Sequence, residues 1–233
     1  MAFAFRQRSD VQGQVRRIAV AQIEAALEAC RGEAGFDKTV HGLRRRCKKL
    51  RGLMRLVEPV FDSFDKENHA LRRAANSLAG TRDAAVMRET FDGLVQFDRG
   101  GDREQGMASE LVDAVKAMLE QQAGGRPDAA EQRQLLAGFA EIAEEVGQRA
   151  KRWKIERHGF ASLKGGLELT YQRMVEAMDA AIADENAAEL HEWRKHTKYH
   201  WHHVSLFGRA APELLGHVGE AFDAASQEAA RRF

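Results

Sequence analysis

Proline, cysteine and long apolar runs are all scarce in this chain, and each scarcity excludes a class of protein. Only 3 prolines and few runs of valine, isoleucine or threonine occur in 233 residues, which favours an all-α protein over a β-rich one. The sequence has no apolar run of about 18 residues and no apolar segment near its start, so we expect neither a membrane span nor a secretory signal. We interpret the two cysteines, Cys30 and Cys47, as small reduced packing residues of a cytoplasmic protein.

Net charge is nearly absent as well, because 36 Lys and Arg residues face 35 Asp and Glu residues. The positive charge is nevertheless concentrated in residues 40–57, VHGLRRRCKKLRGLMRLV, which carry seven Arg or Lys residues. No acidic residue lies between Asp37 and Glu58. A local excess of this kind indicates a binding site for an anion rather than a generally basic surface.

The basic stretch is also amphipathic when it is wound as a helix with about 100° per residue. A row of cationic side chains and a set of apolar side chains each fall within an arc of about 80°. The row consists of His41, Arg44, Lys48, Arg51 and Arg55, and the apolar arc of Leu43, Cys47, Leu50, Met54 and Val57. Like charges one turn apart repel by a few tenths of a kcal/mol, so a row without interleaved acids predicts an anionic ligand.

Glycine, proline and polar clusters divide the chain into helices with short connections. We expect a first helix from an N-cap near Ser9 or Asp10 to about Cys30, and the basic helix up to Pro59. Further helices are expected at about 66–78, 82–97, 104–122, 128–157, 162–182, 187–208 and 212–231. Short connections predict that sequential helices are antiparallel neighbours. The polar segment 98–102 predicts a boundary between halves 1–98 and 104–233 of a single domain, 1–233.

The chain also repeats itself at an offset of 150 residues. Residues 190–207, LHEWRKHTKYHWHHVSLF, align with residues 40–57 and share the pattern H-x-x-R-[RK]-x-x-K. The matched pairs are His41 with His191, Arg44 with Arg194, Arg45 with Lys195, and Lys48 with Lys198. The match is partial, since Lys49, Arg51 and Arg55 are replaced by Tyr199, Trp201 and Ser205.

These features together resemble the CHAD family, the conserved-histidine α-helical domain. The resemblance rests on the doubled pattern, on the segment LAGTRD at 78–83, and on Tyr171 and Arg173 before the second pattern. It covers nearly the whole chain. It implies two antiparallel four-helix bundles related by a pseudo-twofold internal repeat. The sequence ends about where a last helix is expected, so we expect that helix to be missing.

The resemblance further implies a module that binds inorganic polyphosphate, or another phosphate polyanion, in a basic groove or channel between the bundles. It also implies targeting to polyphosphate granules in the cytoplasm, and it implies no cofactor. The polyphosphate-binding residues that it predicts are His41, Arg44, Arg45, Lys48, Lys49, Arg51, Arg55, Arg82, Arg173, His191, Arg194, Lys195 and Lys198.

Arg and Lys suit a ligand that is a chain of phosphates without bases. An arginine can fork onto two phosphate oxygens, and a lysine supplies a compact charge. The row on the basic helix spans about 21 Å, which is the length of several phosphates. Affinity for such a ligand should fall steeply with salt, by analogy with nucleic-acid backbones.

Purely structural roles for these residues stay open. The row can be a solvated helix face, His41 and His191 can hold neighbouring helices instead of a ligand, and Arg82 with Asp83 can cap a helix. His196 and His200 are spaced like metal ligands, but HxxxH alone is a weak signal and we expect no metal site.

Three other functions compete with polyphosphate binding. They are a binder of the nucleic-acid phosphate backbone, a phosphohydrolase or an accessory domain of one, and an oligomerisation scaffold. The sequence has no nucleophile–base constellation, glycine-rich phosphate loop or paired carboxylates with metal-ligand spacing. We therefore predict that the protein is not an enzyme.

Overall fold

The computed structural model describes residues 3–7, 9–78, 87–88, 90–96, 98, 109–122, 127–184, 186–208 and 210. Regular structure in these residues is helical, without strands, which confirms the all-α prediction. The helices are α1 (Val11–Arg31), α2 (Phe36–Leu56), the short 3₁₀ helix η1 (Glu58–Val60), α3 (Phe64–Asn76), α5 (Ser109–Gln122), α6 (Ala129–Ala150), α7 (Ala161–Asp184) and α8 (Ala187–Phe207). Residues 87–88, 90–96 and 98, in and just after the helix predicted at 82–97, are helical as well. The helix expected at 212–231 lies outside the described residues.

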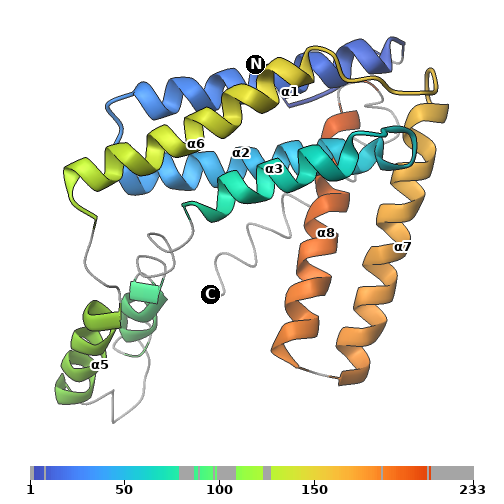
Figure 1. Ribbon diagram of the computed structural model, residues 1–233. Helices are drawn as coiled ribbons and strands as arrows, with labels where there is room; N and C mark the ends of the chain where they lie inside the picture. The colour runs from blue at the N-terminus through green and yellow to red at the C-terminus, as the bar shows by residue number, and fades with distance from the viewer. Residues whose placement is uncertain are drawn as a thin grey trace.

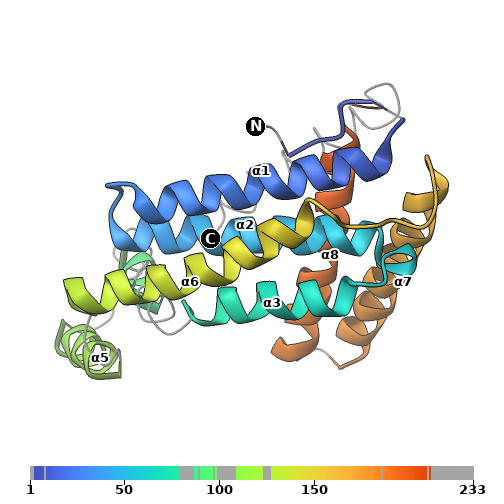
Figure 2. The ribbon, with the colours of Figure 1, turned by 45° about the horizontal axis from the view of Figure 1, so that its top comes forward.

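Four long helices form a bundle around one apolar core. Helix α1 packs against α2 and α6, and α3 packs against the same two helices, so α2 and α6 lie diagonally across the bundle (Figures 1 and 2). The core includes Leu43, Leu53 and Met54 of α2 and Phe139 of α6, all with 2% exposure or less. Burying each such side chain contributes about 1.5–3 kcal/mol to folding.

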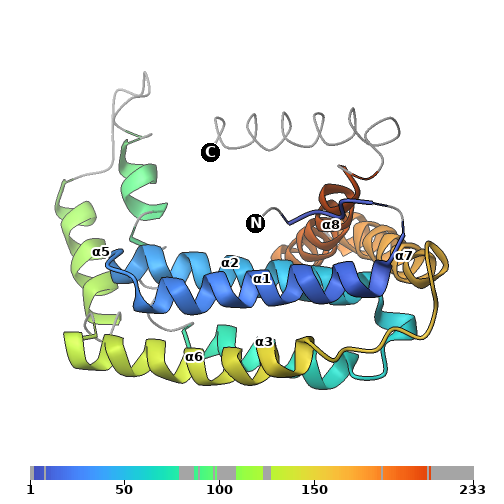
Figure 3. The same ribbon diagram turned by 90° about the horizontal axis from the view of Figure 1, so that it is seen from above.

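Helices α7 and α8 form a hairpin that packs on the bundle at the C-terminal part of α2 (Figures 1 and 3). Helix α7 approaches so closely that a Cβ atom on Gly166 would lie 2.0 Å from the carbonyl oxygen of Leu56. The N-terminal segment binds the C-terminal end of α8, because the Phe5 amide donates to the Leu206 carbonyl at 2.8 Å. The position of α8 against α2 thus rests on contacts from both ends of the chain.

The order of helices in space departs from their order in the sequence. The prediction of sequential neighbours holds for α1 with α2, α2 with α3, and α7 with α8. It is wrong for α6, which packs against α1 and α3. Helix α6 also ends at Ala150 rather than near 157, because the next residues cross to α1 in a non-helical segment. The division at 98–104 stays a prediction, although α6, from the second predicted half, completes the bundle of α1, α2 and α3.

None of the helices described here has the length and apolar character that crossing a membrane requires.

Candidate functional site

Helix α2 turns its apolar arc into the bundle and its cationic side chains outward. The five residues of the predicted apolar arc are 2% exposed or less, which confirms that prediction. His41, Arg45 and Lys48 are exposed, and Arg44 and Lys49 are partly buried. Among the cations of α2, Arg44, Arg45 and Lys49 form no ion pair with any residue that the structure describes. These three residues therefore leave positive charge on this half of the helix that no described acid pairs with.

The C-terminal half of the row is used inside the protein. Arg51 donates its Nε hydrogen to Asn68 Oδ1 at 2.8 Å, and Arg55 donates to Glu58 Oε2 at 3.4 Å. Both guanidinium groups also lie over the Tyr199 ring, at 5.8 Å and 4.5 Å from its centroid. Burial lowers the pKa of Arg51, and Tyr199 opposes that effect. The row is thus not uniformly open to a ligand.

Arg44 is tied to the neighbouring helix as well. One of its terminal amines donates to the Ala75 carbonyl at the end of α3, at 3.0 Å. A guanidinium group held in this way supports α3, and its Nε is buried without an acceptor among the described residues.

Helix α8 presents a second set of cations, as the repeat predicts. His191, Arg194 and Lys198 are exposed, and the ammonium group of Lys198 lies 5.1 Å from the centroid of the Trp201 ring. Lys195 is different, because it forms an ion pair with Glu192 one turn earlier. The aromatic residue that replaces a cation of the first repeat, Tyr199, is buried under the arginines of α2.

The two basic helices meet at Gly52, where a side chain would crowd α8. A Cβ atom on Gly52 would lie 3.1 Å from the Cβ atom of His202, which is tighter than ordinary packing. The buried ring of His203 donates from Nε2 to the Gly52 carbonyl at 2.9 Å. Glycine in a helix interior costs about 1 kcal/mol relative to alanine, so its presence in the basic helix is a signal of close approach.

Cations from both helices converge on this junction. Burial, followed by the charges of Lys49, Lys198 and Lys48, lowers the pKa of His202 to about 3. Burial also lowers the pKa of His203 to about 4, although the hydrogen bond to the Gly52 carbonyl raises it. The junction therefore gathers lysines of α2 and α8 around histidines that stay neutral at physiological pH.

A carboxylate that sequence reasoning missed fixes the hairpin to the bundle. Glu58 accepts two hydrogen bonds from Arg173 of α7, both at 3.0 Å, in addition to the bond from Arg55. Glu58 directly follows the basic stretch, so its proximity to Arg55 was readable in the sequence, whereas its partner on α7 was not. Two predicted ligand-binding arginines are thus engaged by one internal anion.

Some of the remaining predicted residues lie within the described residues and others do not. Arg82 and its neighbours in the LAGTRD segment, apart from Leu78, lie outside the described residues. Tyr171 is exposed, and the centroid of its ring lies 5.6 Å from that of the His200 ring. Within the ranges that the structure describes, no group of three or more His, Cys, Asp or Glu side chains is arranged to hold a metal ion. Both cysteines are free thiols.

Comparison with known proteins gives one match. The family model described as the CHAD domain matches residues 15–229. No curated protein and no solved structure matches the chain.

Proposed function

The chain belongs to the CHAD domain family, and from this membership and the junction of α2 and α8 we propose that it is a non-enzymatic binding module for inorganic polyphosphate. The bound polymer would lie along the exposed cations of α2 and pass to those of α8. By the same proposal the module directs the protein to polyphosphate granules in the cytoplasm.

The observation that carries the proposal is that Lys49 of α2 and Lys198 of α8 lie over two aromatic rings, Phe3 and Trp201, that both pack against His202. Ammonium groups brought together from two helices repel one another, and each is more stable when an anion lies between them. Repulsion by Arg45 and Arg46, added to burial, also lowers the pKa of Lys49. A polyanion that follows both helices would relieve this repulsion along its whole length.

Two acids on the elements beside the junction support the same interpretation, because they are already paired. Glu58 is occupied by two arginines and Glu192 by Lys195. Neither carboxylate is free to neutralise the exposed cations or to repel a phosphate chain strongly. Acids held in this way leave the positive potential on one face of α2 and α8.

The thiols favour a binding role over nucleophilic catalysis. Burial raises the pKa of Cys30 to about 11 and that of Cys47 to about 12. At neutral pH both remain protonated, whereas a catalytic cysteine needs a lowered pKa.

The test is a binding titration of long-chain polyphosphate with the full chain at about 0.1 M salt, in competition with duplex DNA at equal phosphate. The double variant Lys48→Ala/Lys198→Ala should weaken polyphosphate binding by about tenfold or more. Arg133→Ala/Lys151→Ala is the matched control, since it removes two exposed cations of α6 and of the residue after it, on the opposite side of the bundle. Equal binding by both double variants, or complete displacement by DNA, would contradict the proposal.

A further inference from the structure

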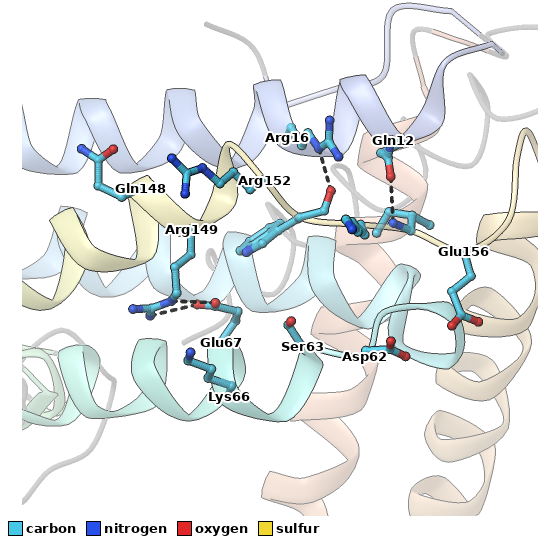
Figure 4. Close-up of a pocket in the computed structure, with 13 residues that line it drawn as sticks. Gln12, Arg16, Asp62, Ser63, Lys66, Glu67, Gln148, Arg149, Arg152 and Glu156 are labelled. Carbon is cyan, nitrogen blue, oxygen red and sulfur yellow. Dashed lines mark hydrogen bonds and ion pairs between the residues drawn. The ribbon is translucent and has the colours of Figure 1, made fainter.

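A pocket of about 800 Å³ lies on a part of the bundle that the polyphosphate proposal does not use. It is formed by α1, by the start of α3, by the end of α6 and by residues 151–156 (Figure 4). None of the predicted polyphosphate-binding residues lines it. Its volume lies within the range of about 300–1,000 Å³ that small-molecule sites occupy.

The wall contributed by residues 153–155 is fixed to α1 by two hydrogen bonds. Arg16 donates its Nε hydrogen to the Trp153 carbonyl at 2.6 Å, and the Ile155 amide donates to Gln12 Oε1 at 2.9 Å. A non-helical segment that is tied down twice has little freedom to collapse into the space beside it. The pocket is therefore a preformed feature of the fold.

Eight charged side chains line the pocket, namely Arg16, Asp62, Lys66, Glu67, Arg149, Arg152, Lys154 and Glu156. Lys66, Arg149 and Arg152 lie toward one end in Figure 4, whereas Asp62 and Glu156 lie toward the other. Arg149 is already satisfied, because it binds both carboxylate oxygens of the buried Glu67, at 2.7 Å and 3.1 Å.

Five of these charges are exposed and have no ion-pair partner in the part of the chain that the structure describes. They are Lys66, Arg152, Lys154, Asp62 and Glu156. Unpaired charges of opposite sign at opposite ends are complementary to a ligand with an anionic end and a cationic end.

Trp153 supplies the second observation that points to a ligand. Its side chain lines the pocket, is 3% exposed and packs on Phe61 with ring centroids 5.1 Å apart. Its indole Nε1 hydrogen is buried and has no acceptor among the described residues. A buried donor without a partner costs about 1–3 kcal/mol, which a ligand oxygen would recover.

We propose that this pocket binds a small zwitterion of the amino-acid or short-peptide class. The ligand's carboxylate faces Lys66 and Arg152, its ammonium group faces Asp62 and Glu156, and a carbonyl or carboxylate oxygen accepts from Trp153. This site is independent of the polyphosphate proposal, because the two share no residue.

The experiment compares three probes of nearly equal shape by calorimetry with the full chain. These are alanylalanine, its N-acetyl form, which keeps only the anion, and its amide, which keeps only the cation. The zwitterion should bind about tenfold more tightly than either blocked form. In a nitrogen–proton NMR spectrum, the zwitterion should also shift the indole N–H signal of Trp153. The variants Trp193→Phe and Trp201→Phe each remove one of the three indole signals, so the signal that remains in both belongs to Trp153.

Two single variants of exposed residues assign the ends. Arg152→Ala should weaken binding of the zwitterion and of the N-acetyl form, and should leave binding of the amide unchanged. Glu156→Ala should weaken binding of the zwitterion and of the amide, and should leave binding of the N-acetyl form unchanged. Both variants should bind polyphosphate normally, and Lys48→Ala/Lys198→Ala should bind alanylalanine normally. Absence of binding by all three probes, equal binding of all three, or preference for the N-acetyl form would overturn the proposal.

Discussion

Single residues at the junction of α2 and α8 have environments that their sequence neighbours do not suggest. His202 and His203 follow one another in a helix rich in cations, and both are buried where α8 meets α2 at Gly52. Their Nδ1 atoms lack hydrogen-bond partners in the described residues. A neutral ring tolerates that position, whereas a charged ring does not.

This burial predicts a loss of stability in acid. The pKa of His202 is about 3 and that of His203 about 4 in the folded chain, against an ordinary value of 6.5. The unfolded chain therefore binds these protons more readily, so their contribution is fully present above pH 6.5 and falls as the pH drops toward 4. Each histidine should lower the free energy of unfolding by about 2 kcal/mol at pH 5, as measured by urea denaturation.

The control isolates these two rings from other titrating groups. The difference in stability between pH 7.5 and pH 5 should shrink in His202→Gln/His203→Gln and should remain in His69→Gln, which alters an exposed residue of α3. An unchanged pH dependence in the double variant would show that the junction does not depend on neutral histidines.

At the scale of elements, the basic helix has two roles divided along its length. Its first half carries exposed cations, and its second half anchors the α7–α8 hairpin through Arg51 and Arg55, with Glu58 of η1. The ion pair of Glu58 with Arg173 joins residues 115 positions apart in the chain. We therefore expect the cations of this surface to separate into ligand contacts and structural struts.

Arg173 and Arg194 provide a direct comparison of the two roles. Arg173→Gln should lower the free energy of unfolding by about 1–2 kcal/mol, because Glu58 loses a bidentate partner, and should leave polyphosphate affinity unchanged. Arg194→Gln removes an exposed cation of α8 and should show the reverse pattern. Denaturation and polyphosphate titration of both variants test this, and weaker binding by a fully stable Arg173→Gln variant would assign Arg173 to the ligand.

Helix α6 depends on a local signal at its start. Asp128 accepts from the amides of Ala130 and Glu131, and the Glu131 side chain accepts from the Asp128 amide, which together form a capping box. Asp128→Ala should therefore cost about 1 kcal/mol of stability in urea denaturation. Glu141→Ala, an exposed change in the interior of the same helix, should cost much less, and equal losses would count against the capping role.

At the scale of the whole molecule, near-zero net charge coexists with a strongly basic surface. The 35 acids and 36 bases balance over the chain, while α2 and α8 keep their exposed cations together. Attraction for a polyanion is then a property of one face, and the remainder of the surface contributes little to it.

This arrangement predicts a specific salt dependence. The logarithm of the polyphosphate binding constant should fall linearly with the logarithm of salt concentration, because each contacting cation releases a counterion. Lys48→Ala/Lys198→Ala should reduce the slope by about two, and Arg133→Ala/Lys151→Ala should leave it unchanged. Identical slopes in the two double variants would mean that binding is spread over the whole surface.

The sequence by itself determined the features that depend on neighbours within one or two turns. Helical period alone separates the buried arc of α2 from its cations, and Asp10 caps α1 as predicted, accepting from the Gly13 amide. The doubled histidine pattern indicates the family without any knowledge of contacts between helices, because the spacing within a helix is fixed at about 3.6 residues per turn.

Only the tertiary structure decided which of those cations remain available. Arg55 and Lys48 share one arc in the sequence, but Arg55 is covered by Tyr199 and held by Glu58, whereas Lys48 is exposed. The place of α6 beside α1 and α3, and the pocket beside residues 151–156, likewise arise from contacts between distant parts of the chain. Helical periodicity contains no information about such contacts, since it fixes the direction of a side chain but not what packs against it.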